Sequence, residues 1–304
     1  MKKKIAPVLL LPAGAVLGLT TEMYRYVFCR KGSKLLNSFG GKKTHAEDYY
    51  EHRDGLAERL RGLPQQRFVI RSERGERLTG HYIPGGGKGK RIAFIVHGYH
   101  SEYADTAGMY YDFYASHGFD IFACDHTAHG ESEGRYIGFG AFECEDCLLW
   151  LRFLQAKFGS DVQIVLHGFS MGAATVLLMS DRCPKNVRFI VADSGYRDAP
   201  TLLKGQLGPL YTPLAAIHRR IAHCELREAD TRQALSHASV PILFVHGQKD
   251  PTVPFKNGPA LFALYRGEKD CLFPENAKHV ESMHVAPEAY ARKLERMIAR
   301  YVTP

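Results

Sequence analysis

The chain has 304 residues, of which 45% are hydrophobic and 24% are charged; these values suit one large globular domain or two small ones and argue against disorder. The net charge is +8, but residues 1–44 hold nine Lys/Arg and one Glu, which leaves 31 basic and 31 acidic residues for the rest of the chain. A neutral body argues against a nucleic-acid-binding face, and the basic amino end points instead to a membrane surface or to targeting.

The amino-terminal segment, residues 1–44, starts with MKKK and continues with 15 apolar residues from Ile5 to Leu19, interrupted by Pro7 and Pro12. This run is shorter than the roughly 20 residues that a spanning helix needs. Three interpretations stay open: an uncleaved membrane anchor reaching to about residue 30, a signal peptide removed after residues 13–15 and giving a secreted protein, or a segment docked on the body. Membrane attachment is the favoured one, with its side undetermined, and we expect the body to work without residues 1–30.

A charged, helical lead-in at 45–66 precedes a body, residues 67–304, in which short apolar runs alternate with helical stretches. Such runs are typical of strands buried on both faces of a parallel sheet, with helices on either side. The sequence therefore predicts one three-layer α/β domain, with a mostly parallel central sheet and helices on both faces. The expected strands are 91–99, 119–125, 162–168, 188–195 and 241–247, after a hairpin around residue 75.

A longer connection, about residues 196–239, separates the last two of these strands and reads as two or three short helices. Helices inserted at this point would form a small lid over the carboxyl ends of the strands, where sheets of this kind bind ligands. Its leucines and tyrosine suggest an apolar acyl or alcohol group as ligand, although the same residues would also serve to pack the lid on the body.

The stretch VLHGFSMGAATVLLM, residues 165–179, places Ser170 between Gly168 and Gly172 where a buried strand passes into a helix. A chain that turns this sharply has little room for side chains, so glycines are needed on both sides and the serine projects from the turn. The start of the following helix favours developing negative charge. Ser170 is therefore the candidate nucleophile.

A serine hydroxyl needs a base to remove its proton and a third group to orient that base. Asp250 follows the strand of PILFVHGQKD, and His279 follows KDCLFPENAK, where another strand would end. We predict Asp250 and His279 as the partners of Ser170, with Asp193 and His284 as the weaker alternatives.

Backbone N–H groups are the expected stabilisers of an oxyanion. Gly98 lets the chain turn after the strand of RIAFIVHGY, so the N–H of Tyr99 can face the same point as the N–H of Met171. We predict that these two donors form an oxyanion hole.

No cofactor or metal is predicted. The seven cysteines are scattered and odd in number, so they do not form a disulfide framework. Cys144 and Cys147 have C-x-x-C spacing but lie in a helical pattern, and Asp125, His126 and His129 match no ligand spacing and fit a turn beneath the site. The glycine-rich stretches lack the spacing of a phosphate or dinucleotide loop.

From about residue 66 to the end, the chain carries the motifs His97-Gly98, the Ser170 turn, DHTAHGESEG at 125–134, HGQKDPTVP at 246–254 and NAKHVES at 276–282. With this set of motifs it resembles the α/β-hydrolase superfamily, and within it bacterial esterases and acyl hydrolases with an amino-terminal anchor. The resemblance implies a serine hydrolase that cleaves carboxylic esters of small to medium apolar acyl groups. A peptidase or amidase with the same triad, and a non-catalytic binding protein on this scaffold, are the alternatives. One departure is Thr127, where the superfamily usually has an arginine.

Overall fold

The computed structural model describes residues 13–33, 36 and 47–303. Its centre is an eight-stranded sheet in the order β1-β2-β4-β3-β5-β6-β7-β8. β1 and β2 form an antiparallel hairpin, β2 pairs antiparallel with β4, and the remaining pairs are parallel. The strands are β1 (Gln66–Arg71), β2 (Arg77–Ile83), β3 (Arg91–Val96), β4 (Asp120–Cys124), β5 (Gln163–Phe169), β6 (Val187–Asp193), β7 (Ile242–Val245) and β8 (Lys269–Leu272).

Burial explains why the apolar runs form these strands. Every residue of β4 and β7 is buried, whereas β1 at the sheet edge alternates between exposed and half-buried residues. A strand covered on both faces needs apolar side chains on both, and an edge strand does not. The predicted parallel strands are thus confirmed as β3 to β7.

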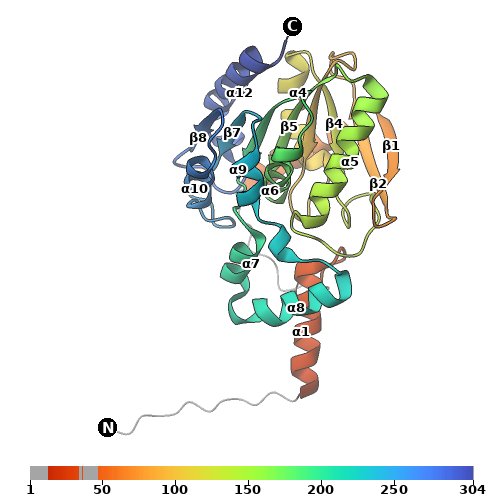
Figure 1. The fold of residues 1–304 in the computed structure, drawn as a ribbon, viewed down its shortest axis with the longest axis vertical. Helices are drawn as coiled ribbons and strands as arrows, with labels where there is room; N and C mark the ends of the chain where they lie inside the picture. The colour runs from red at the N-terminus through yellow and green to blue at the C-terminus, as the bar shows by residue number, and fades with distance from the viewer. Residues whose placement is uncertain (1–12, 34–35, 37–46, 304) are drawn as a thin grey trace.

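Helices cover both faces of the sheet (Figure 1). One core cluster contains Trp150 of α5 and Val176 of α6, and the other contains Tyr110 of α4 and Leu294 of α12. The three-layer α/β architecture predicted from the sequence is therefore confirmed. The α-helices are α1 (Ala13–Phe28), α3 (Glu47–Arg61), α4 (Tyr103–Ser116), α5 (Ala141–Phe158), α6 (Met171–Leu178), α7 (Ala199–Leu207), α8 (Tyr211–Ala222), α9 (Thr231–His237), α10 (Asn257–Leu264), α11 (Ser282–Val285) and α12 (Pro287–Tyr301).

The predicted insertion at 196–239 folds as α7, α8 and α9, joined by 3-10 turns at Gly208–Leu210 and Leu226–Glu228. In Figure 1, α7 and α8 lie at the lower end of the molecule, and α8 packs beside α1. The hydroxyl of Tyr24 in α1 and Nδ1 of His218 in α8 share a buried hydrogen bond of 3.1 Å. The insertion therefore packs on the amino-terminal helix.

The carboxyl-terminal half of α1 belongs to the folded body. Tyr24, Val27 and Phe28 are buried in the core cluster that contains α5 and α6, and Cys29 forms a β-bridge with Tyr136. This matches the docked alternative for that part of the segment, so the body is not complete without residues 1–30. The reason is the sequence MYRYVF, whose aromatic rings fill space between α8 and the body.

The first part of the apolar run, residues 5–12, lies outside the described residues. Within the described ranges, no helix combines the length and the apolar character required to cross a membrane.

Candidate active site

Ser170 stands on the sharp turn between β5 and α6. Its backbone has φ +55° and ψ −115°, which is strained for a residue with a side chain. A Cβ on Gly168 would lie 2.3 Å from the carbonyl oxygen of Gly172, and one on Gly172 would lie 2.1 Å from that of Val96. Glycine is therefore required at both positions, as the sequence indicates, and the turn exposes Ser170 at the carboxyl end of β5.

The structure brings Ser170, His279 and Asp250 together from three separate segments. Oγ of Ser170 lies 2.8 Å from Nε2 of His279, and Nδ1 of His279 lies 2.7 Å from Oδ2 of Asp250. Since a carboxylate only accepts, Nδ1 carries the proton and Nε2 is free to accept the proton of the serine. Asp250 follows β7 and His279 follows β8, so both reach the same sheet edge as Ser170.

Asp250 is held as an anion. Burial by itself would raise the pKa of its carboxyl, but hydrogen bonds from His246 and His279 outweigh burial and lower the pKa below its usual range. The backbone N–H groups of Thr252 and Val253 each donate to Oδ1 over 2.8 Å. His246, whose Nε2 lies 3.3 Å from Oδ2, is a neighbour that the sequence reasoning missed, although it ends the strand that carries Asp250.

The two weaker alternatives lie elsewhere. Oδ1 of Asp193 accepts from the hydroxyl of Ser194 at 2.9 Å and Oδ2 from Tyr290 at 3.1 Å, and burial raises the pKa of this carboxyl to about 6. Nε2 of His284 lies 3.7 Å from a carboxylate oxygen of Asp48. Asp193 meets Ser170 only through the backbone, where its carbonyl oxygen accepts from the N–H of Ser170 over 2.8 Å. The side chains of Asp193 and His284 instead contact the groups named above.

The predicted oxyanion donors flank the nucleophile. Met171 is the first residue of α6, where backbone N–H groups have no partner within the helix. A Cβ on Gly98 would lie 3.2 Å from Cβ of Ser170, so the turn that carries Tyr99 passes directly beside the nucleophile. The hydroxyl of Tyr99 points the other way and donates to the carbonyls of Tyr26 (2.9 Å) and Val27 (3.0 Å) at the end of α1.

Buried histidines support this turn from below. The N–H of His126 donates to Nε2 of His97 over 3.0 Å, and the N–H of His100 donates to Nε2 of His129 over 3.1 Å. Burial lowers the pKa of His97 to about 4 and that of His129 to about 3, so both imidazoles are neutral acceptors at neutral pH. His126 and His129 thus serve in the turn beneath the site, as the sequence indicates.

A cavity of about 140 Å³ opens beside Ser170 and His279. Its other walls come from α3 (Tyr49, Arg53) and α4, and none of its lining residues that the structure describes belongs to the insertion at 196–239. The insertion at 196–239 therefore adds no described residue to this cavity, whereas α3, the helix of the predicted lead-in, lines it beside Ser170.

Part of the chain matches a known family model, and most of the chain is similar to known proteins. Residues 87–223 match the family model described as serine aminopeptidase, S33. The chain is 25% identical over 240 residues to the uncharacterized protein YqkD of Bacillus subtilis, covering 76% of this chain and 78% of that protein. It is 21% identical over 237 residues to the human α/β-hydrolase domain-containing protein 17B, covering 76% and 73%.

Solved structures decide the fold. The Pyrococcus furiosus esterase Pf2001 superposes with a TM-score of 0.64 at 20% identity, covering 81% of this chain and 96% of that one. An esterase domain from a Rhodothermus marinus protein superposes with a TM-score of 0.59 at 20% identity, covering 79% and 100%. The protein has the α/β-hydrolase fold.

The departure at Thr127 is compensated from another part of this hydrolase fold. Arg74, in the hairpin between β1 and β2, places its guanidinium 2.8 Å from Oδ2 of Asp146 and 2.9 Å from the hydroxyl of Thr127. Thr127 in turn donates to Asp146 over 2.6 Å. Burial raises the pKa of Asp146 to about 6, and Arg74 opposes that rise. Asp146, which contacts Thr127, therefore has an ion-pair partner in Arg74 of the hairpin.

Proposed function

We propose that the protein is a serine hydrolase that cleaves carboxylic esters through an acyl-enzyme intermediate. The observation that carries the proposal is the continuous hydrogen-bonded path from Ser170 through His279 to Asp250 at the mouth of a cavity. Similarity to esterases of the same fold supports the hydrolase class.

In the proposed mechanism, Nε2 of His279 takes the proton of Ser170 while Oγ attacks the ester carbonyl carbon. Asp250 stabilises the imidazolium, and the N–H groups of Tyr99 and Met171 receive the oxyanion. The bond to the alcohol then breaks, and His279 gives its proton to the leaving oxygen. Water, activated by the same imidazole, attacks the acyl-enzyme and releases the acid, which restores Ser170.

The cavity supports esters with a short acyl group as substrates. Its volume of about 140 Å³ leaves little space, and Met109, Tyr110 and Phe169 give it apolar walls. Arg53 and Asp105 add charge to the lining. A panel of p-nitrophenyl esters of increasing acyl length should therefore show the highest kcat/KM for short chains, with a steep fall for long ones.

The runner-up is a peptidase or amidase that uses the same three side chains. The description of the matching family model favours it, and Asp105 in the cavity lining could accept the ammonium group of an amino-terminal residue. Turnover of aminoacyl p-nitroanilides that exceeds turnover of the short esters would establish this alternative and overturn the esterase proposal. The Ser170→Ala variant should lose either activity, with Ser236→Ala as the serine control, because Ser236 is exposed on α9 away from the cavity.

A non-catalytic binding protein is the alternative from another class. A fluorophosphonate probe tests it without a substrate, because the probe reacts only with an activated serine. We expect the wild type to be labelled and the Ser170→Ala variant to remain unlabelled. A folded wild-type protein that the probe does not label would favour the binding protein.

We further propose that the amino end attaches the protein to a membrane surface. Leu17 and Leu19 of α1 are 70% and 50% exposed, and Ile221 of α8 is 45% exposed beside Arg219 and Arg220. Apolar side chains flanked by basic ones suit an anionic bilayer surface. The full-length chain should float with phosphatidylglycerol-containing vesicles, and Leu17→Glu/Leu19→Glu should reduce this. A mature protein outside the cell that begins near residue 15 would instead support the secreted alternative.

A further inference from the structure

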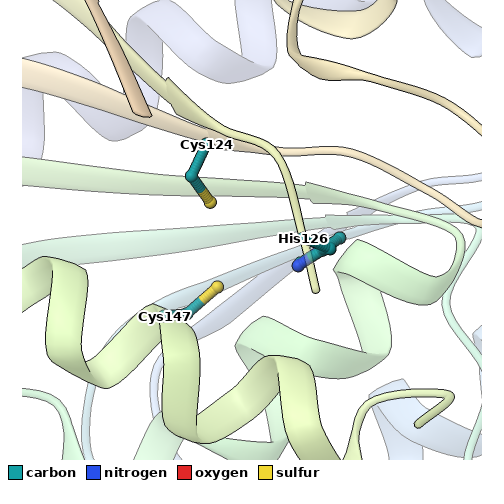
Figure 2. Close-up of side chains that lie close together, drawn as sticks. All are labelled: Cys124, His126 and Cys147. Atoms are coloured by element: carbon teal, nitrogen blue, oxygen red, sulfur yellow. The ribbon is translucent and has the colours of Figure 1, made fainter. Parts of the chain in front are cut away.

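Three side chains with the donor atoms of a soft-metal site meet beneath the loop that carries Tyr99. Cys124 ends β4, His126 follows two residues later, and Cys147 comes from α5 (Figure 2). Their exposed fractions are 1%, 1% and 0%. The two Sγ atoms and an imidazole nitrogen all lie within 4.8 Å of one another, and this is the only such group of three potential ligands within the described ranges.

The imidazole of His126 is prepared to act as a ligand. Its Nε2 lies 3.0 Å from the carbonyl oxygen of His97, which can only accept, so Nε2 carries the proton and Nδ1 presents a lone pair. Nδ1 is buried and has no hydrogen-bond partner among the residues that the structure describes. Buried polar atoms of this kind are normally satisfied. Metal-bound histidines commonly donate their other N–H to a backbone carbonyl, which is the arrangement present here.

The geometry allows one ion among the three atoms. If all three ligand atoms were 4.8 Å apart, a point midway among them would lie about 2.8 Å from each atom. The usual distance from zinc to a nitrogen or sulfur ligand is about 2.0–2.3 Å. Small side-chain rotations close that difference. Figure 2 shows the Cys124 and Cys147 sulfurs facing the same space, with the imidazole extending toward it.

Charge selects the ion. Both sulfur atoms lie in the core, where a thiolate without a cation beside it is costly. A bound cation changes this, because coordination deprotonates a thiol outright. Two thiolates and a neutral imidazole together neutralise a divalent ion, whereas a monovalent ion would leave a net negative charge in the core.

We propose that Cys124, His126 and Cys147 bind one Zn²⁺ ion. Binding would form two Zn–S bonds and one Zn–N bond, leave the fourth coordination position to a water molecule, and release two thiol protons to solvent, without a change of oxidation state. Because the three residues are buried, the ion enters as the chain folds. Its role is structural: the N–H of His126 donates to His97, which precedes Gly98 and Tyr99, so the ion fixes the support of the proposed oxyanion donor.

The full-length chain, unfolded under reducing conditions and refolded with excess Zn²⁺, should retain about one zinc per chain after dialysis, measured by mass spectrometry of the metal. Cys147→Ala should lose this zinc. Cys144→Ala is the matched control, because Cys144 is also a buried cysteine of α5 but contacts Arg182 instead, and it should keep the zinc. Parallel fluorophosphonate labelling separates this result from the fate of the serine-hydrolase proposal.

Three results would overturn the zinc site: a folded wild type without bound zinc, equal zinc in wild type and Cys147→Ala, or retention of Cu⁺ but not Zn²⁺ in a parallel refolding. If Cys147→Ala does not fold, the wild type refolded with Co²⁺ tests the site instead. Thiolate-to-cobalt charge-transfer absorption in the near ultraviolet is expected, and its absence in a folded protein would overturn the proposal.

Discussion

Replacing Gly98 by alanine would test the oxyanion loop without removing any proposed catalytic group. The new Cβ would lie 3.2 Å from Cβ of Ser170, 3.3 Å from the carbonyl oxygen of Phe169 and 3.8 Å from Oγ of Ser170. Contacts this close require the loop to move by a few tenths of an ångström relative to the nucleophile. The N–H of Tyr99, one residue later, moves with the loop.

The size of the effect follows from these distances. Loss of a complete oxyanion donor lowers kcat by about 10²-fold to 10³-fold, and a misplacement of about 1 Å can cost about 10²-fold. A shift of a few tenths of an ångström should therefore lower kcat for a short p-nitrophenyl ester by about tenfold. Mild overpacking should cost about 1 kcal/mol of unfolding free energy, which corresponds to about 2–4 °C in Tm.

The assay compares kcat and Tm of the wild type, Gly98→Ala and Gly205→Ala. Gly205 is the matched control, because it lies in α7, a methyl group added there would have nothing within 4 Å, and alanine favours a helix. Gly205→Ala should keep the wild-type kcat with an equal or higher Tm. A Gly98→Ala variant with wild-type kcat would refute the assignment of the oxyanion donor to this loop.

Three further predictions follow from the contacts around the site. Deleting residues 1–30 removes the buried side chains of Tyr24, Val27 and Phe28 and should lower both Tm and ester turnover; values equal to those of the full-length chain in a thermal melt and an ester assay would contradict this. Burial lowers the pKa of His218 to about 4, so its contribution to stability is present above pH 6.5 and falls by about 3 kcal/mol as the pH drops from 6.5 to 4. In His218→Gln, the free energy of unfolding measured with urea should fall less steeply with decreasing pH over that range, by up to about 1.4 kcal/mol per pH unit. An unchanged pH dependence would argue against this role of His218. Arg74→Ala should lower the free energy of unfolding by about 3 kcal/mol, because it leaves Asp146 buried without its cation. Adding Asp146→Asn should recover part of this loss in chemical denaturation, and no recovery would count against the ion pair.

The local pattern of the sequence was sufficient for the sheet and for the turn at Ser170. Strands buried on both faces require apolar runs, and a sharp turn from strand to helix requires glycine at positions 168 and 172, so both features are written in neighbouring residues. The chain order of Ser170, Asp250 and His279 likewise follows from the strand ends at which they lie.

Contacts between distant segments could not be predicted from such local sequence patterns. The aromatic end of α1 is indistinguishable in sequence from an interfacial anchor, because burial against a protein and burial in a membrane surface select similar side chains. The placement of α3 over the nucleophile, with Arg53 in the cavity wall, depends on how that helix packs against α4, which no local pattern encodes.

The amino-acid sequence by itself determined the layered sheet, the glycine-flanked turn at Ser170 and the three candidate triad residues, because each depends on a short run of neighbours. Only the tertiary structure decided that Arg74 replaces the missing arginine at Thr127, and that Cys124, His126 and Cys147 converge. Those arrangements join residues that lie up to 72 positions apart in the chain, and their side chains meet only after the strands and helices have packed.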